Sequence, residues 1–164
     1  IWYNEHYLRE KPDEEIAETV SELAKESGIE IPGRNYLEKA ISLLKDRVSK
    51  VDEFLSYGSF FFKEPEEYDE NALKKWKDDS PELVSAYLDK ISGIPEAEFE
   101  AANLKSLLEK TIEEKDVGFG KLMMPLRIAV TGLGFGPDLF QTMELLGKEK
   151  VVARIQKALE ELGS

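Results

Sequence analysis

The sequence KLMMPLRIAVTGLGFGPDLFQTMELLG, residues 121–147, is compatible with two different folds. It joins an apolar segment that contains Arg127, a loop with alternating glycines, and an amphipathic segment that follows Pro137. An arginine among apolar neighbours usually has a partner, because burying an unpaired charge is costly. Arg127 is therefore the first candidate functional residue, and we interpret the rest of the chain as its scaffold.

The first possible fold is a strand, IAVTG, that runs into a glycine-rich phosphate loop. A dinucleotide fingerprint needs Gly-x-Gly-x-x-Gly inside a strand–helix–strand unit. Here the glycines alternate, no Gly-Lys-Ser or Gly-Lys-Thr follows, and no second alternating run could pair with the strand. The second possible fold is helix–loop–helix, with Gly132 as a helix C-cap. Gly134 and Gly136 then indicate either a tight turn or a backbone that a ligand approaches closely.

Helical periodicity and helix-start signals extend outward from this stretch in both directions. Asn35 and Ser80 are predicted N-caps, and Pro125 and Pro137 are placed in the first turns of two helices. Residues 57–62 are the one run that could pass for a strand, and we interpret them as a helix end and a buried aromatic connector. The expected helices cover residues 13–27, 36–48, 53–57, about 72–76, 81–92, 98–115, 124–131, 137–146 and 148–162. The chain is therefore predicted to be all-α.

Two small helical subdomains are expected. Residues 1–63 form the first, and residues 1–11 are interpreted as the tail of a preceding region. Residues 64–79 form an acidic linker with a short helix, and residues 80–164 form the second subdomain. Because the sequence starts at Ile1 in what looks like a helix end, we expect it to be a piece of a longer protein.

The composition excludes several classes of site. The chain has no cysteine and one histidine, His6, which argues against thiolate chemistry, a His-based zinc site and a Ser-His-Asp triad. No run approaches the roughly 20 apolar residues of a membrane span. The carboxylates form no arrangement with a base, a nucleophile or metal-ligand spacing, so we predict that this piece is not catalytic and contains no cofactor.

The net charge of −12 argues at first against a nucleic-acid partner. Two segments are nevertheless mildly basic: residues 34–50 have five basic and two acidic residues, and residues 117–154 have five and three. Residues 64–116, in contrast, have seven basic and sixteen acidic residues. Charge therefore permits RNA binding at two segments, and it also permits an acidic helical module for protein–protein interaction.

A resemblance separates these alternatives. Residues 120–159 contain, in order, PLRIAVTG, PDLF and LLGKE, followed by an arginine in the last predicted helix. This combination resembles the C-terminal signature of bacterial-type glutamyl-tRNA synthetases, which are class I glutamate–tRNA ligases. Upstream, NEHYLR at residues 4–9, LLKDRV at 43–48 and FFF at 60–62 resemble further segments of that family.

The resemblance implies an anticodon-binding region, in which two helical subdomains form a cage around the anticodon loop of tRNA(Glu). The catalytic domain, with its ATP and Mg²⁺ sites, would precede Ile1 in the same parent chain. Family members are cytoplasmic, and we expect a monomer without a membrane partner. The positions that match the family's anticodon-binding residues are Arg47, Arg127, Gly136, Pro137, Leu139 and Phe140.

Single-stranded bases are read by arginine planes, aromatic rings and hydrogen bonds, which agrees with this assignment. The arginine that matches Arg47 is associated in the family with the wobble base and with rejection of tRNA(Gln). The family often has Ser or Thr where this chain has Gly136, so a side-chain contact is not expected there. Possible contacts to tRNA phosphates are assigned to Arg9, Lys45, Lys121, Lys148 and Arg154.

Overall fold

The computed structural model describes residues 11–163 and is all-α. The described residues form nine α-helices and three 3₁₀-helices, and none of them is in a strand. The segment IAVT lies in a helix, and the glycines at 132, 134 and 136 follow the helix end, which excludes the phosphate-loop fold. The all-α prediction is confirmed.

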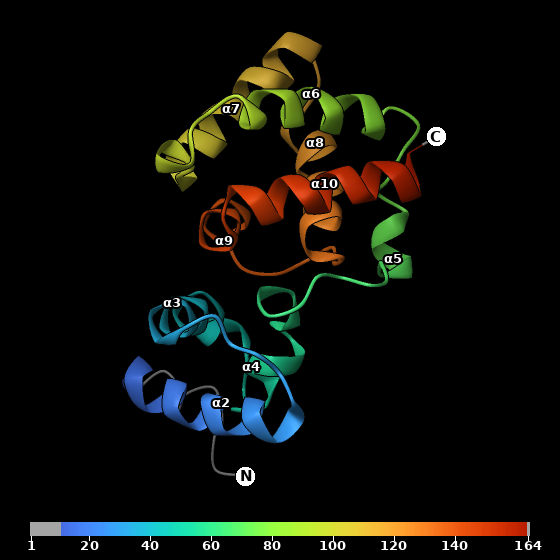
Figure 1. Ribbon diagram of the computed structural model, residues 1–164. Helices are drawn as coiled ribbons and strands as arrows, with labels where there is room; N and C mark the ends of the chain where they lie inside the picture. The colour runs from blue at the N-terminus through green and yellow to red at the C-terminus, as the bar shows by residue number, and fades with distance from the viewer. Residues whose placement is uncertain (1–10, 164) are drawn as a thin grey trace. The chain divides into compact units, whose positions relative to one another are not determined.

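The chain divides into two compact units, coloured along the sequence in Figure 1. The first consists of residues 1–64 with 136–138, and the second of residues 65–135 with 139–164. The helices of the first unit are α2 (Asp13–Ser27), α3 (Arg34–Leu44), η1 (Lys45–Arg47), α4 (Glu53–Ser56) and η2 (Ser59–Phe61). Those of the second are α5 (Glu70–Leu73), α6 (Ser80–Ser92), η3 (Glu96–Glu98), α7 (Ala101–Lys115), α8 (Phe119–Thr131), α9 (Leu139–Leu146) and α10 (Lys148–Leu162).

In the first unit, α2 packs along α3, and the aromatic connector closes the core. Phe60 and Phe61 are buried and their rings lie 4.6 Å apart between centroids. The hydroxyl of Tyr36 on α3 donates to the carbonyl of Phe61. This bond fixes η2 to α3, so residues 57–62 act as core and not as a sheet strand, as expected.

In the second unit, α10 packs against α6, α8 and α9, and Figure 1 shows it lying across α8. The largest buried side chain is Tyr87 of α6, whose hydroxyl donates to the Leu104 carbonyl of α7 at 2.9 Å. Burial raises the pKa of the Tyr87 phenol above its ordinary value, which keeps this donor protonated. The hydrogen bond therefore ties α6 to α7 within the core.

Some predicted helix starts are wrong. Gly33, not Asn35, is the N-cap of α3, because the extended backbone at Gly33 lets the helix begin at Arg34. Ser80 is the first residue of α6 and not its cap, since its hydroxyl accepts the Lys77 N–H in the preceding turn. Helix α7 begins at Ala101 instead of residue 98, because Phe99 has a non-helical backbone.

Helix α8 is longer than predicted, and α9 starts later. We expected α8 to begin at residue 124, but it begins at Phe119, so Pro125 lies inside it. Leu122 is fully buried, and burial of this earlier turn outweighs the hydrogen bond that Pro125 cannot make. Helix α9 begins at Leu139, two residues after Pro137.

The C-terminal end of α8 is held by contacts from two other segments of its unit. Gly132 follows the helix in the left-handed conformation, with φ +79°, as its predicted C-cap role requires. The Asp69 N–H donates to the Gly132 carbonyl at 2.9 Å. Arg154 of α10 is 5% exposed and donates to the Val130 carbonyl at 2.9 Å, which satisfies a carbonyl of the last turn. We call Asp69, Val130, Gly132 and Arg154 the α8 end cluster.

Gly132→Ala tests how closely the chain passes this turn. A Cβ at Gly132 would lie 3.0 Å from both the Glu67 carbonyl oxygen and Pro65 Cβ, whereas a Cβ at Gly28 would meet nothing within 4 Å. Both glycines are left-handed, which costs alanine about 1–2 kcal/mol. In denaturant unfolding, Gly132→Ala should therefore lose more stability than Gly28→Ala, and equal losses would contradict the close approach.

Arg154→Met tests the buried guanidinium. It removes a charge-assisted hydrogen bond and leaves the Val130 carbonyl without that donor, so we expect a loss of about 1.5–3 kcal/mol in the free energy of unfolding. Lys105→Met, which removes an exposed cation from α7 of the same unit, should change stability by less than about 0.5 kcal/mol. A loss below about 0.5 kcal/mol for Arg154→Met would contradict the structural role.

Candidate nucleic-acid interface

Arg127 is half-buried on α8, one turn before the α8 end cluster. Its carbonyl accepts from the hydroxyl of Thr131 at 2.9 Å, and the same hydroxyl oxygen accepts the Leu133 N–H at 3.1 Å. The turn that follows the helix is thus bonded back to the residue that carries the guanidinium. The backbone that carries Arg127 is therefore held in place.

The loop after α8 has two glycines with different roles. Gly134 has no room for a larger residue without adjustment, because a Cβ there would lie 3.2 Å from Ala72 Cβ of α5. Gly136 has φ +148°, a conformation that residues with a Cβ rarely adopt. The departure from the family's Ser or Thr at this position therefore coincides with a glycine-specific backbone. Gly136 and Pro137 are both buried.

Leu139 and Phe140 form the first turn of α9 and are 0% and 5% exposed. Their side chains belong to the buried set of the protein, so what these residues can present to a ligand is mainly backbone. The first N–H groups of a helix have no partner within the helix, and they suit oxygen acceptors. Contact of these two residues with a base stays a prediction.

Phe135 is a candidate that the sequence reasoning missed. Its side chain is 54% exposed, and among the described residues it is one of two large exposed hydrophobic side chains, the other being Phe119 at 41%. The signal was present in the sequence, because Phe135 stands between Gly134 and Gly136 and belongs to no predicted helix face. Phe140, the aromatic residue among the positions that match the family, is buried.

Arg47 lies at the end of η1 in the first unit and is exposed. No partner of its guanidinium is found among residues 11–163. The turn that carries it is anchored, because the Lys45 ammonium donates to the Lys11 carbonyl and pairs with Asp13 Oδ1 at 3.0 Å. An anchored turn with an exposed guanidinium is suited to a base edge or a phosphate.

The cations assigned to phosphates have intramolecular partners wherever they are described. Lys45 and Arg154 bind the groups given above, the Lys148 ammonium donates to the Ile94 carbonyl at 2.7 Å, and Lys121 pairs with Asp79 at 3.1 Å. Arg154 is the least available, because reaching a phosphate would break a buried bond. The Lys121–Asp79 pair is exposed, so little free energy is needed to separate the two side chains. Arg9 lies outside the described residues.

The predicted residues fall in both units. Arg127, Leu139 and Phe140 belong to the second unit, whereas Arg47, Gly136 and Pro137 are grouped with the first. The predicted residues therefore form two sets, one in each unit.

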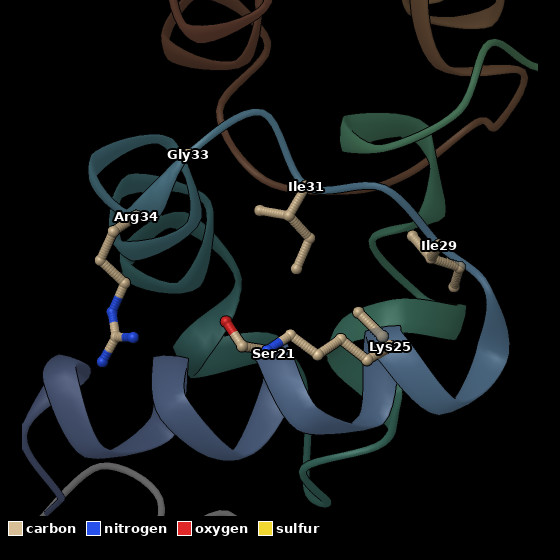
Figure 2. Close-up of a pocket in the computed structure, with 7 residues that line it drawn as sticks. Ser21, Lys25, Ile29, Ile31, Gly33 and Arg34 are labelled. Atoms are coloured by element: carbon tan, nitrogen blue, oxygen red, sulfur yellow. The ribbon is translucent and has the colours of Figure 1, made fainter.

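A pocket of about 290 Å³ lies in the first unit, and none of the predicted residues lines it. Figure 2 shows Ile31 of the α2–α3 connection pointing into it above Ser21 of α2. The Arg34 guanidinium at its edge donates to the Glu14 carbonyl at 3.0 Å. The lining has no acid–base pair, and the described chain has no cluster of three or more potential metal ligands. In the same residues, no helix is long and apolar enough to cross a membrane.

Comparison with known proteins gives a family match over most of the chain. A family model described as "Anticodon binding domain" matches residues 15–159. The chain is 35% identical to the glutamate–tRNA ligase of Flavobacterium johnsoniae over 161 residues, 98% of this chain and 32% of that protein. It is 37% identical to the corresponding ligase of Bacteroides thetaiotaomicron over 163 residues, 99% of this chain and 32% of that protein. The chain thus spans about a third of the curated relatives it matches.

Solved structures agree. A crystal structure of a glutamate–tRNA ligase from Elizabethkingia meningosepticum, in complex with its amino acid, matches with a TM-score of 0.89 and 35% identity over 98% of this chain and 32% of that one. The glutamate–tRNA synthetase of Elizabethkingia anophelis matches with a TM-score of 0.82 and 34% identity over 97% and 30%. The chain therefore belongs to the anticodon-binding domain family, in the form carried by glutamate–tRNA ligases.

Proposed function

We propose that this chain holds tRNA(Glu) by its anticodon loop, while a catalytic domain outside the chain uses ATP and Mg²⁺ to join glutamate to that tRNA. The single observation that carries the proposal is the presentation of Arg127 beside a glycine-rich loop, in a chain of the anticodon-binding family. The chain itself contributes recognition and no chemistry. We further propose that the protein is cytoplasmic and monomeric.

The roles of the two arginines differ by unit. Arg127 contacts the second or third anticodon base, because a planar guanidinium can bond a base edge and this one is carried by a fixed turn of α8. The backbone of Gly136 and Pro137 approaches the same bases. The first turn of α9, with Leu139 and Phe140, contacts these bases through its backbone N–H groups. Arg47 contacts the wobble base from the first unit and discriminates against tRNA(Gln).

The electrostatics of the chain favour specific over general RNA binding. Residues 64–116 are strongly acidic and repel phosphates, whereas the basic excess lies in residues 34–50 and 117–154. An RNA would therefore be attracted at these two segments and repelled elsewhere. Lys121 is the most accessible of the described candidates for a phosphate, because its pair with Asp79 is exposed and weak.

Arg127→Ala in the whole protein that carries this chain should weaken tRNA(Glu) binding about tenfold or more, since a good base contact contributes about 1–3 kcal/mol. The measurement is a filter-binding titration with tRNA(Glu) and with a tRNA whose anticodon is changed. The variant should lose the preference between the two. Arg34→Ala removes another exposed arginine and should leave this preference unchanged.

Two outcomes would reject the proposal. The first is absence of salt-dependent tRNA binding by the wild-type protein, because phosphate contacts make RNA affinity fall steeply with salt. That result would favour the alternative, an acidic helical module that binds proteins. The second is an unchanged anticodon preference in Arg127→Ala.

Arg47→Gln tests discrimination separately. If the exposed Arg47 guanidinium rejects tRNA(Gln), the variant should charge tRNA(Gln) with glutamate more readily than wild type does, relative to tRNA(Glu). The readout is the ratio of kcat/KM for the two tRNAs. An unchanged ratio would remove Arg47 from this role without affecting the assignment of Arg127.

A further inference from the structure

Phe135 is the most exposed large hydrophobic residue in the described chain, and the proposed function does not yet explain it. A single exposed aromatic ring is common on protein surfaces and needs a second observation to acquire meaning. Here that observation is the backbone next to the ring. The residues before Phe135 are held by contacts, and Gly136 after it has a conformation that favours glycine.

The three residues before Phe135 are held in place. Gly132 is fixed by the α8 end cluster, the Leu133 N–H donates to the Thr131 hydroxyl at 3.1 Å, and Gly134 lies against Ala72 of α5. Each of these contacts is within the second unit. The ring therefore projects from a segment whose conformation is already set.

The residue after Phe135 is also constrained. Gly136 has φ +148°, which residues with a Cβ rarely adopt. An exposed ring that directly follows the packed Gly134 loses little conformational freedom when it binds a ligand. This is preorganisation of an aromatic surface in a loop that directly follows the helix of Arg127.

We propose that Phe135 stacks on an unpaired base of the bound RNA. The inference rests on the proposed function and deepens it by naming a stacking contact. A planar base fits an aromatic face, and stacking of this kind tolerates any base. Phe135 would therefore add affinity for the tRNA, whereas Arg127 would add preference for a particular anticodon. The local basic excess of residues 117–154 favours an RNA base over an acidic protein surface as the occupant.

The chain offers a matched control. Phe119, in the first turn of α8, is the other large exposed hydrophobic residue of the described chain, at 41%. A general effect of removing an exposed ring would appear in both variants. A stacking contact would appear in Phe135→Ala alone.

The experiment measures binding of tRNA(Glu) to the whole protein that carries this chain. Phe135→Ala should weaken binding about tenfold, because one stacked base is lost, and should leave the slope of log affinity against log salt unchanged, because no phosphate contact is lost. Phe135→Trp should bind at least as well as wild type, and Phe119→Ala should bind like wild type. Thermal unfolding of Phe135→Ala should show a cooperative transition, so that a loss of binding is measured on a folded protein.

A second readout reports stacking directly. A 2-aminopurine base placed in the anticodon loop loses fluorescence when it stacks, so quenching should occur with wild type and Phe135→Trp and should be reduced with Phe135→Ala at saturating protein. Wild-type affinity or wild-type quenching in Phe135→Ala would overturn the stacking contact. So would a weaker salt slope, which would indicate a lost phosphate contact, or an equal loss in Phe119→Ala.

Failure of the proposed function has a different signature. In that case the wild-type protein, Arg127→Ala and Phe135→Ala would all fail to bind tRNA. If wild type binds and Phe135→Ala binds equally well, the proposed function stands and the stacking contact is wrong. A loss of self-association in Phe135→Ala, measured by sedimentation without RNA, would also overturn the contact and assign the ring to a second copy of the chain.

Discussion

The packing of the second unit depends on the hydrogen bonds that satisfy the carbonyls at the C-terminal end of α8. The helix ends at Gly132, and two segments from elsewhere in the unit bind the carbonyls around it: the Asp69 N–H bonds to Gly132, and the buried Arg154 guanidinium bonds to Val130. Carbonyls at a helix C-terminus have no N–H donor within the helix, and a cation near that end is favoured by the helix dipole. These two hydrogen bonds hold the segment that contains Asp69 and helix α10 against the helix that carries Arg127.

The same kind of hydrogen bond explains why basic residues in this chain have two different roles. On α10, the side chains of Lys148, Arg154 and Lys157 each donate to a backbone carbonyl of a different segment. These cations tie the unit together and do not primarily form a phosphate-binding surface. In the proposed function, recognition of RNA depends on a few groups outside this set, above all Arg127, Arg47 and the loop that contains Phe135. An acidic chain can bind RNA in this way, because few contacts are needed where repulsion is low.

Much of the fold was predictable because it follows from local patterns. Apolar spacing identified α2 and α10 to within a residue, and the absence of paired alternating runs excluded a sheet. The errors came from tertiary packing. Pro125 suggested a helix start, but burial of Leu122 extends α8 upstream of it. Ser80 suggested a cap, but its hydroxyl binds the Lys77 N–H of the preceding turn.

The sequence motif identified which residues to consider for the site, but it did not show which of their side chains are exposed. The motif identified Arg127 and the loop, whereas a sequence does not show which side chains point outward. Phe140 and Arg154 are buried, and Phe135, which no helix pattern includes, is exposed. Exposure results from how separate segments pack, so periodicity does not give the exposure of a loop residue such as Phe135.

The most direct test of the central claim is photocrosslinking of the whole protein to tRNA(Glu) with 4-thiouridine in the anticodon, followed by mass spectrometry of the linked peptides. The account predicts cross-links to peptides that contain residues 127–140, with a wobble-base substitution shifting them toward the peptide of Arg47. Cross-links confined to the acidic segment 64–116, or their absence at saturating RNA, would contradict it.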